Sequence, residues 1–255
     1  MVLPLQDDVL YGPIHSRRLG RSLGINLLPG TYKLCSFNCL YCHYGWTKVH
    51  TLDAGPHTLD LPQPERVVER IRIALRSALE FDYLTFSGNG EPTLHPQFAE
   101  IVDQVVRLRD QYRPAVRLAL LSNSTGLHRS EVRDCITQID LPVFKLDAGT
   151  PQLFGRINRP VRGLEFSTIL DGLASLDRPY IQTLLVDGSP SNVTPDHLDA
   201  YMRQICRIKP AEVHIYSIDR PVPDRHLLRV SPQRLMEIAR LGEAQTGAPF
   251  KAFWM

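Results

Sequence analysis

The chain has 255 residues, of which 43% are hydrophobic and 22% are charged. These proportions exclude a disordered tail, a collagen and a small disulfide-rich scaffold. The length permits one large domain or two small ones, and it lies close to that of a single α/β barrel. The 29 basic and 27 acidic side chains give a formal net charge of +2. So small a charge does not support electrostatic binding to nucleic acid or to an anionic membrane, although it leaves nucleic acid possible.

The sequence carries no signal for membrane insertion or secretion. No run approaches the roughly 18 consecutive apolar residues that a bilayer demands, because the apolar run at 118–121 ends at Ser122 and Asn123. At the start of the chain, Pro4 and Gln6 stand where a signal peptide has a basic end and then an apolar run. The sequence therefore predicts a cytoplasmic protein with no membrane partner.

From residue 23 onward, short β-type runs alternate with amphipathic segments, which is typical of a parallel α/β sheet. Apolar runs predict six strands, at 23–27, 83–86, 116–121, 143–146, 181–186 and 213–218. Apolar stripes at helical spacing lie within 67–79, 98–106 and 198–205. A last helix is predicted over 231–242, where Ser231 and Pro232 suit an N-cap and a first turn and Gly242 suits a stop.

The order of these elements limits the fold to two arrangements. Right-handed crossovers either curl six βα units into a partial barrel or spread them as an open sheet. We predict a partial (β/α)6 TIM-like barrel with a parallel sheet, forming a single domain over 1–255 with extensions at 1–22 and 219–255. In both arrangements the loops at the carboxyl ends of the strands gather on one face, where a site is expected.

Three of the five cysteines, Cys35, Cys39 and Cys42, fall within one loop after the first predicted strand. They are too crowded for a disulfide framework, and three close thiolates suit zinc, Cu(I) or an iron-sulfur cluster. A fourth protein ligand would close a structural zinc site, and the candidates are His43, His50 and His57. Alternatively, a cluster that ordinarily takes four cysteines keeps one iron open for a substrate or cofactor.

The two remaining cysteines, Cys135 and Cys206, lie about ninety residues or more from this loop. Each falls in a stretch with helical periodicity, where a lone cysteine behaves as a small buried hydrophobe. Both are therefore predicted to be buried structural residues with no role in metal binding.

The cysteine loop belongs to a wider pattern. Tyr41 stands just before the last cysteine, and further motifs occupy 11–13, 16–24, 86–96 and 216–221. With these motifs the chain resembles the radical S-adenosylmethionine (SAM) enzymes, whose hallmark is Cys-x3-Cys-x2-Cys with an aromatic residue before the last cysteine. Within that superfamily it is similar to the Fe-S oxidoreductases related to the wyosine-tRNA synthases.

The resemblance implies a radical SAM Fe-S oxidoreductase that uses a 4Fe-4S cluster to cleave SAM reductively and to abstract hydrogen from an unassigned substrate. By this likeness, the cluster ligands are Cys35, Cys39 and Cys42. The glycine-rich segment that receives the amino group of SAM matches Gly88, Asn89, Gly90 and Glu91, where missing side chains let the backbone come close. Tyr41 would lie against the adenine.

Three more residues are candidates for contacts to SAM. Asn123 follows the third predicted strand at the level where the family tends to place a polar contact, although a turn-forming asparagine would look the same. Lys145 and Asp147 share one face of the fourth strand, and burying both charges is costly without a polar ligand. The loop with Arg156, Asn158 and Arg159 either contacts an anion or only stabilises itself.

The sequence offers no catalytic acid, base or radical relay, and it leaves the substrate open. Because there is neither a flavin-binding motif nor a second cysteine cluster, an external electron donor is expected, either a ferredoxin or a flavodoxin. One alternative is wyosine-type tRNA modification, which is weakened because the chain lacks the extra cysteines and the flavodoxin-like domain of known relatives. Another is a zinc-stabilised α/β binding module that catalyses no reaction.

Overall fold

The computed structural model describes residues 2–254, which divide into two compact units that alternate along the chain. The first, here called the N-terminal unit, contains residues 4–36 and 47–142. The second, the C-terminal unit, contains residues 2–3, 37–46 and 143–254. The cysteine loop therefore passes from one unit into the other, with Cys35 in the first and both Cys39 and Cys42 in the second.

A twisted β-sheet forms the centre of the N-terminal unit. Its strands lie in the order β1 (Leu10–Ser16), β2 (Gly20–Ile25), β5 (Tyr83–Phe86) and β6 (Arg117–Ser122). Strand β1 runs antiparallel to β2, whereas β2, β5 and β6 are parallel. A separate short parallel pair consists of β3 (Leu34–Cys35) and β4 (Val49–His50).

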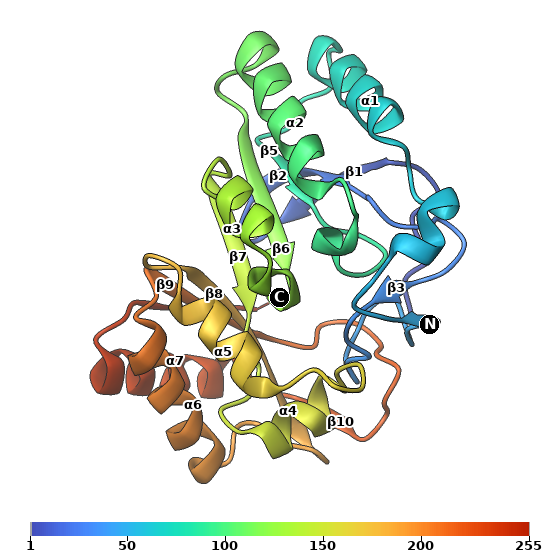
Figure 1. Cartoon of the computed structure of the whole chain (residues 1–255). Coiled ribbons are helices and arrows are strands. Elements are labelled where there is room, and N and C mark those ends of the chain that lie inside the picture. The colour runs from blue at the N-terminus through green and yellow to red at the C-terminus, as the bar shows by residue number, and fades with distance from the viewer. Residues whose placement is uncertain (1, 255) are drawn as a thin grey trace. The chain divides into compact units, whose positions relative to one another are not determined.

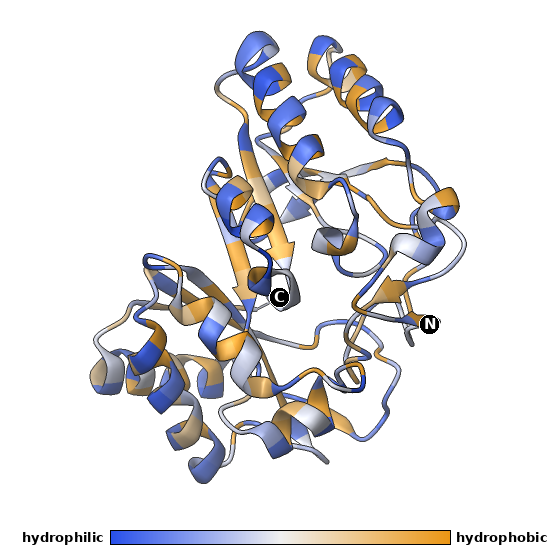
Figure 2. Ribbon diagram, in the orientation of Figure 1, coloured by the Kyte–Doolittle hydropathy of each residue, from blue (hydrophilic) through white to orange (hydrophobic). Residues whose placement is uncertain are grey.

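Helices cover this sheet because each presents one apolar face. The helices are α1 (Pro64–Arg76), α2 (Phe98–Tyr112) and α3 (Ser130–Ile136), and the short 3-10 turns are η1 (Gly55–Asp60), η2 (Pro92–Leu94) and η3 (Thr125–His128). Helices α1 and α2 lie side by side (Figure 1). In Figure 2 the strands β5 and β6 are hydrophobic while the helices are two-sided, as expected for helices packed on a core.

The C-terminal unit repeats this arrangement with parallel strands. They lie in the order β7 (Leu141–Lys145, of which residues 143–145 belong to this unit), β8 (Tyr180–Gly188), β9 (Glu212–Ser217) and β11 (Phe250–Phe253). Strand β10 (Leu227–Arg229) pairs antiparallel with β8. The helices are α4 (Pro151–Ile157), α5 (Phe166–Ala174), α6 (Pro195–Ile208) and α7 (Pro232–Thr246). Across residues 2–254, no helix has the length and apolar character needed to cross a membrane.

All six predicted strands correspond to observed ones, namely β2 and β5 to β9. The prediction for the last helix was right at its start, where the Ser231 hydroxyl accepts a hydrogen bond from the backbone N–H of Arg234. The predicted stop at Gly242 was wrong, since α7 continues to Thr246 and ends at Gly247, whose φ is +71°. Gly242 is instead a packing residue: a Cβ there would lie 2.6 Å from the Phe250 ring.

The two cysteines outside the loop differ from each other. Cys135 is buried in α3, as predicted. Cys206 is exposed on α6, so its prediction as a buried residue was wrong. The neighbouring Ile205 occupies the buried face of that helix, and one residue further along a helix the side chain points about 100° away.

Candidate active site

Cys35 ends strand β3 and is buried in the N-terminal unit. The glycine-rich segment lies against the residue before it, because the Leu34 N–H donates to the carbonyl oxygen of Asn89 over 3.1 Å. At Gly90 the φ angle is +149°, and a Cβ would stand 1.7 Å from the carbonyl oxygen of Leu34. Only glycine tolerates this combination of angle and contact, so the segment packs backbone to backbone against Leu34, the residue before the first cysteine of the loop.

The side chain of Asn89 forms hydrogen bonds with two neighbouring loop segments. Its Oδ1 accepts a hydrogen bond from the Gln6 N–H (2.9 Å), and its Nδ2 donates to the carbonyl oxygens of Gln6 and Pro29 (2.8 Å each). The neighbouring Gly88 has a φ of +127°, and the Asn26 Oδ1 lies 2.6 Å from where a Cβ would stand. These residues shape the segment, and any contact from Asn89 to a ligand comes from its backbone.

Glu91 is buried and connects the glycine-rich segment to the loop after β6. Its Oε1 accepts from the Thr93 N–H (3.1 Å) and the Ser122 hydroxyl (2.9 Å), and its Oε2 accepts from the Asn123 N–H (2.6 Å). Burial raises the pKa of Glu91, and these hydrogen bonds oppose that rise. The carboxyl group therefore fixes the backbone of Asn123.

Asn123 points its side chain at the cysteine loop. Its Nδ2 lies 3.6 Å from the Sγ of Cys35 and 2.8 Å from the Ser36 hydroxyl oxygen. Its Oδ1 accepts from the N–H (3.0 Å) and the hydroxyl (2.7 Å) of Thr125. Asn123, which was predicted to contact SAM, thus lies against Cys35, the first cysteine of the loop.

In the C-terminal unit, the cysteine loop lies against the chain that follows α4. The Asn38 N–H donates to the carbonyl oxygen of Asn158, and the Leu40 N–H donates to that of Ile157, both over 3.0 Å. Cys39 is buried and Cys42 is half-buried. The Cys42 N–H donates to the carbonyl oxygen of Cys39 over 3.2 Å, so these two residues form a tight turn.

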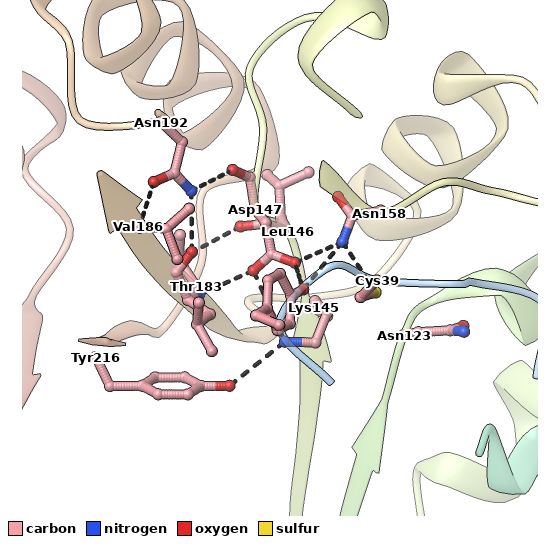
Figure 3. Close-up of polar contacts among 12 residues, drawn as sticks. Cys39, Asn123, Lys145, Leu146, Asp147, Asn158, Thr183, Val186, Asn192 and Tyr216 are labelled. Atoms are coloured by element: carbon pink, nitrogen blue, oxygen red, sulfur yellow. Dashed lines mark hydrogen bonds and ion pairs between the residues drawn. The ribbon is translucent and has the colours of Figure 1, made fainter. Parts of the chain in front are cut away.

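Asp147 is the centre of a buried polar network in this unit (Figure 3). Its Oδ2 accepts hydrogen bonds from the Tyr41 hydroxyl and from Nδ2 of Asn158, the latter over 2.7 Å. Its Oδ1 accepts from the Leu184 N–H (2.8 Å) and lies 3.7 Å from the Lys145 Nζ. The structure thus brings together Tyr41, Lys145 and Asp147, three of the predicted site residues.

Lys145 extends between two aromatic rings. Its Nζ lies 5.2 Å from the centre of the Tyr41 ring, 5.8 Å from that of Tyr216 and 3.4 Å from the Tyr216 hydroxyl oxygen. Burial disfavours the charge of Lys145, but attraction to Asp147 and Tyr216 outweighs it, so the pKa of Lys145 is raised and the ammonium persists. Burial and the Asp147 charge raise the pKa of Tyr41, which keeps its phenol neutral.

The donor set of the loop suits an iron-sulfur cluster. Cys35, Cys39 and Cys42 form no disulfide within the described residues, and thiolates are the ligands such clusters take. Within residues 2–254, no three or more His, Cys, Asp or Glu side chains are grouped as a ready metal site. Two candidate zinc ligands have other neighbours: the His50 Nε2 lies 3.0 Å from the Ser36 carbonyl oxygen, and the His57 Nδ1 lies 3.2 Å from the Tyr32 hydroxyl.

Asn158 was not predicted from the sequence to lie at the cysteine loop. It is buried, and its Nδ2 lies 3.5 Å from the Sγ of Cys39 and 3.0 Å from the Tyr41 hydroxyl. The only sequence signal was its place in a loop on the expected active face. That position indicates a contact but does not say which group is contacted.

Comparison with protein families decides the family of this chain. The model of the radical SAM superfamily matches residues 31–188, a stretch that includes the cysteine loop, the glycine-rich segment and the Asp147 network. This chain belongs to the radical SAM superfamily. Members of this superfamily use a 4Fe-4S cluster and SAM, and these are its cofactors. The family predicted from the sequence motifs is thereby confirmed.

Two curated proteins are similar to this chain over most of its length. The chain is 33% identical to the UPF0026 protein slr1464 of Synechocystis sp. over 84% of its own length and 77% of that protein. It is 26% identical to a protein named GTPase Obg of Brachyspira hyodysenteriae over 94% of its length, but it spans only 34% of that relative. The chain thus spans about a third of one relative and about three quarters of the other.

A solved structure of TYW1 with a lysine-pyruvate adduct bound is also similar. It superposes with a TM-score of 0.61 at 18% identity, over 89% of this chain and 75% of that one. An identity this low shows the fold alone. The predicted fold class, a partial TIM-like α/β barrel, is confirmed by this match together with the superfamily model.

Proposed function

We propose that this radical SAM enzyme binds its 4Fe-4S cluster through Cys35, Cys39 and Cys42 and abstracts hydrogen from a substrate still to be assigned. One iron is left without a protein ligand in this proposal, because the loop supplies three thiolates and a cluster ordinarily takes four. When bound, the reduced cluster would supply the electron for the reductive cleavage of SAM to methionine and a 5′-deoxyadenosyl radical. The protein holds the reactants in register and excludes water from them.

A single observation carries this proposal: the backbone contact between the glycine-rich segment and Leu34, next to Cys35. The bond from the Leu34 N–H to Asn89 and the contact at Gly90 make the two segments one packed unit. In the proposal, the backbone from Gly88 to Glu91 receives the amino group of SAM beside the open iron. Glu91 keeps this segment in register with Asn123 through its 2.6 Å hydrogen bond.

The Asp147 network supplies the other proposed contacts. Both oxygens of Asp147 accept hydrogen bonds from protein groups, so its role is to orient Tyr41 and Lys145. The Lys145 ammonium is the group suited to an anionic or hydroxylated ligand, such as the carboxylate or ribose of SAM. The neutral ring of Tyr41 suits the adenine, since its hydroxyl is held by Asp147 and its face remains the surface for stacking.

The proposal needs an electron from outside the chain. Radical SAM enzymes in general use an external donor, and we propose a ferredoxin or a flavodoxin for this one. Because none of the five cysteines forms a disulfide within residues 2–254, we also propose a reducing compartment, the cytoplasm, as the place of action.

The test is anaerobic purification followed by iron and sulfide analysis and by reduction with dithionite in the presence of SAM. The proposal predicts about four irons per chain and formation of 5′-deoxyadenosine. Cys39→Ala should lose both iron and product, while the matched variant Cys206→Ala should keep both because this thiol is exposed on α6. Loss of iron in the Cys206 variant would overturn the ligand assignment.

The same preparation separates the alternatives. Zinc without 5′-deoxyadenosine would identify a zinc-stabilised binding module in place of an enzyme. Wyosine-type tRNA modification predicts that added tRNA is altered in a reaction that depends on SAM. If 5′-deoxyadenosine forms while added tRNA stays unmodified, the substrate is instead a small molecule, a peptide or a partner protein.

A further inference from the structure

Two buried asparagine amides donate hydrogen bonds to sulfur atoms of the cysteine loop, one in each compact unit. The Nδ2 of Asn123 lies 3.6 Å from the Sγ of Cys35, and the Nδ2 of Asn158 lies 3.5 Å from the Sγ of Cys39. We propose that Asn123 and Asn158 are positioning residues that raise the reduction potential of the cluster through these N–H···S bonds. This inference rests on the proposed function, because it takes Cys35 and Cys39 as cluster ligands.

The orientation of the Asn123 amide follows from its other partners. Its Oδ1 accepts a hydrogen bond from the backbone N–H of Thr125 over 3.0 Å, and a backbone N–H can only donate. The nitrogen must therefore face the other way, toward the Sγ of Cys35 and the hydroxyl oxygen of Ser36. Its two hydrogens meet these two acceptors, and the bond from the Asn123 N–H to Glu91 fixes the backbone from which the amide projects.

The orientation of the Asn158 amide is fixed by Asp147. An ionised carboxylate only accepts hydrogen bonds, so the atom 2.7 Å from the Asp147 Oδ2 must be the amide nitrogen. The same nitrogen lies 3.0 Å from the Tyr41 hydroxyl oxygen and 3.5 Å from the Sγ of Cys39, so its second hydrogen is shared between these two acceptors. Figure 3 shows the Asn158 amide between the Asp147 carboxylate and Cys39. Its Oδ1 has no hydrogen-bond partner among the described residues, so no competing contact turns the amide around.

The sign of the effect follows from electrostatics. One-electron reduction by the external donor adds one negative charge to the cluster and its thiolates, with no proton transferred. A hydrogen-bond donor at a thiolate sulfur stabilises the more negative state more, and hydrogen bonds to the sulfurs are a known determinant of cluster potentials. Both amides are buried, with residue exposures of 7% for Asn123 and 1% for Asn158, so water screens the interaction little.

The experiment is a redox titration of the anaerobically purified holoenzyme without SAM, followed by electron paramagnetic resonance, in Asn123→Leu and Asn158→Leu variants. Leucine keeps a similar volume and removes the donor. At a fixed solution potential, the ratio of reduced to oxidised cluster in each variant should be lower by about tenfold than in the unmodified protein. This corresponds to a reduction potential more negative by about 59 mV for one electron. Because the two bonds reach different thiolates, the shifts should add in the double variant.

Asn192 provides the matched control. It is equally buried, its Nδ2 donates to the carbonyl oxygens of Asp147 and Leu184 (2.9 Å each), and its Oδ1 accepts from the Val186 N–H (2.8 Å). Asn192→Leu therefore breaks a comparable network without touching a cysteine. Its potential should equal that of the unmodified protein, and a shift as large as those of the two test variants would overturn the proposal.

A second variant covers the case in which leucine prevents folding. Asn123→Asp keeps the acceptor for Thr125 and removes the donor to Cys35, so it should also lower the potential. An unchanged or higher potential in a variant that still holds about four irons overturns the inference and leaves the proposed function intact. Absence of iron from the unmodified protein would instead refute the proposed function, so the two failures are distinguishable.

Discussion

Replacing Gly90 by alanine tests the packing of the glycine-rich segment against the cysteine loop. The structure predicts two separate penalties at this position. The φ of +149° lies in a region that side chains rarely adopt, and the new Cβ would stand 1.7 Å from the backbone oxygen of Leu34. A strained backbone of this kind costs roughly 1–3 kcal/mol, and relieving the contact requires the segment to move, so the total should exceed about 3 kcal/mol.

Two other glycines separate these penalties. At Gly163 the φ is +89° but no atom lies within 4 Å of the added Cβ, so Gly163→Ala should cost only the strain of roughly 1–3 kcal/mol. Gly155 lies inside α4, has no positive φ and also has open space around its Cβ. Gly155→Ala should therefore stabilise the protein by about 0.4–1 kcal/mol, since alanine suits a helix better.

The assay is urea unfolding of each anaerobically purified variant, followed by circular dichroism with iron content measured in parallel. The midpoints should rank Gly155→Ala above the unmodified protein, which should rank above Gly163→Ala, with Gly90→Ala lowest. The iron content should fall most in the Gly90 variant, because its segment packs beside Cys35. A Gly90 variant with the midpoint of the Gly163 variant would refute the close contact as a source of instability.

Two further predictions concern other parts of the chain. In the native protein at pH 8, Cys206 should be alkylated and Cys135 should not, because Cys206 is exposed while burial raises the pKa of Cys135 to about 12; equal labelling in peptide mass spectra would contradict this. The hydrogen bond from Arg21 lowers the pKa of Asp82 to about 2 from 3.8, so its contribution to stability is present above about pH 4 and lost as the pH falls toward 2. Urea midpoints should thus fall more steeply with acid in the unmodified protein than in Asp82→Asn, and parallel curves would exclude this ion pair as a cause.

The strands were predictable because each is a short apolar run bounded by turn residues. The run at 83–86 coincides with β5. Strand β1 was not predicted, because Gly12 and Pro13 interrupt it and its pairing with β2 shifts between Tyr11 and Ile14. Glycine and proline lower strand propensity, and a strand at the sheet edge tolerates both where a central strand does not.

Some residues of the candidate site could also be predicted from the sequence, and others could not. The cysteine loop could be predicted because all three thiols are close in sequence and their spacing carries the information. The contact of Asn158 with Cys39 joins residues 119 positions apart, and that of Glu91 with Asn123 joins residues 32 positions apart. Such contacts depend on how strands and loops pack, and a polar residue in a loop has the same local sequence whether it caps a turn or touches a ligand.

Mössbauer spectroscopy of the anaerobic protein labelled with 57Fe, recorded before and after addition of SAM, tests whether the cluster has one iron without a cysteine ligand. We expect a 4Fe-4S signal in which one iron of the four changes its isomer shift when SAM is added, since three irons are held by Cys35, Cys39 and Cys42. A four-iron spectrum that SAM leaves unchanged, or a protein that holds zinc in place of iron, would contradict it.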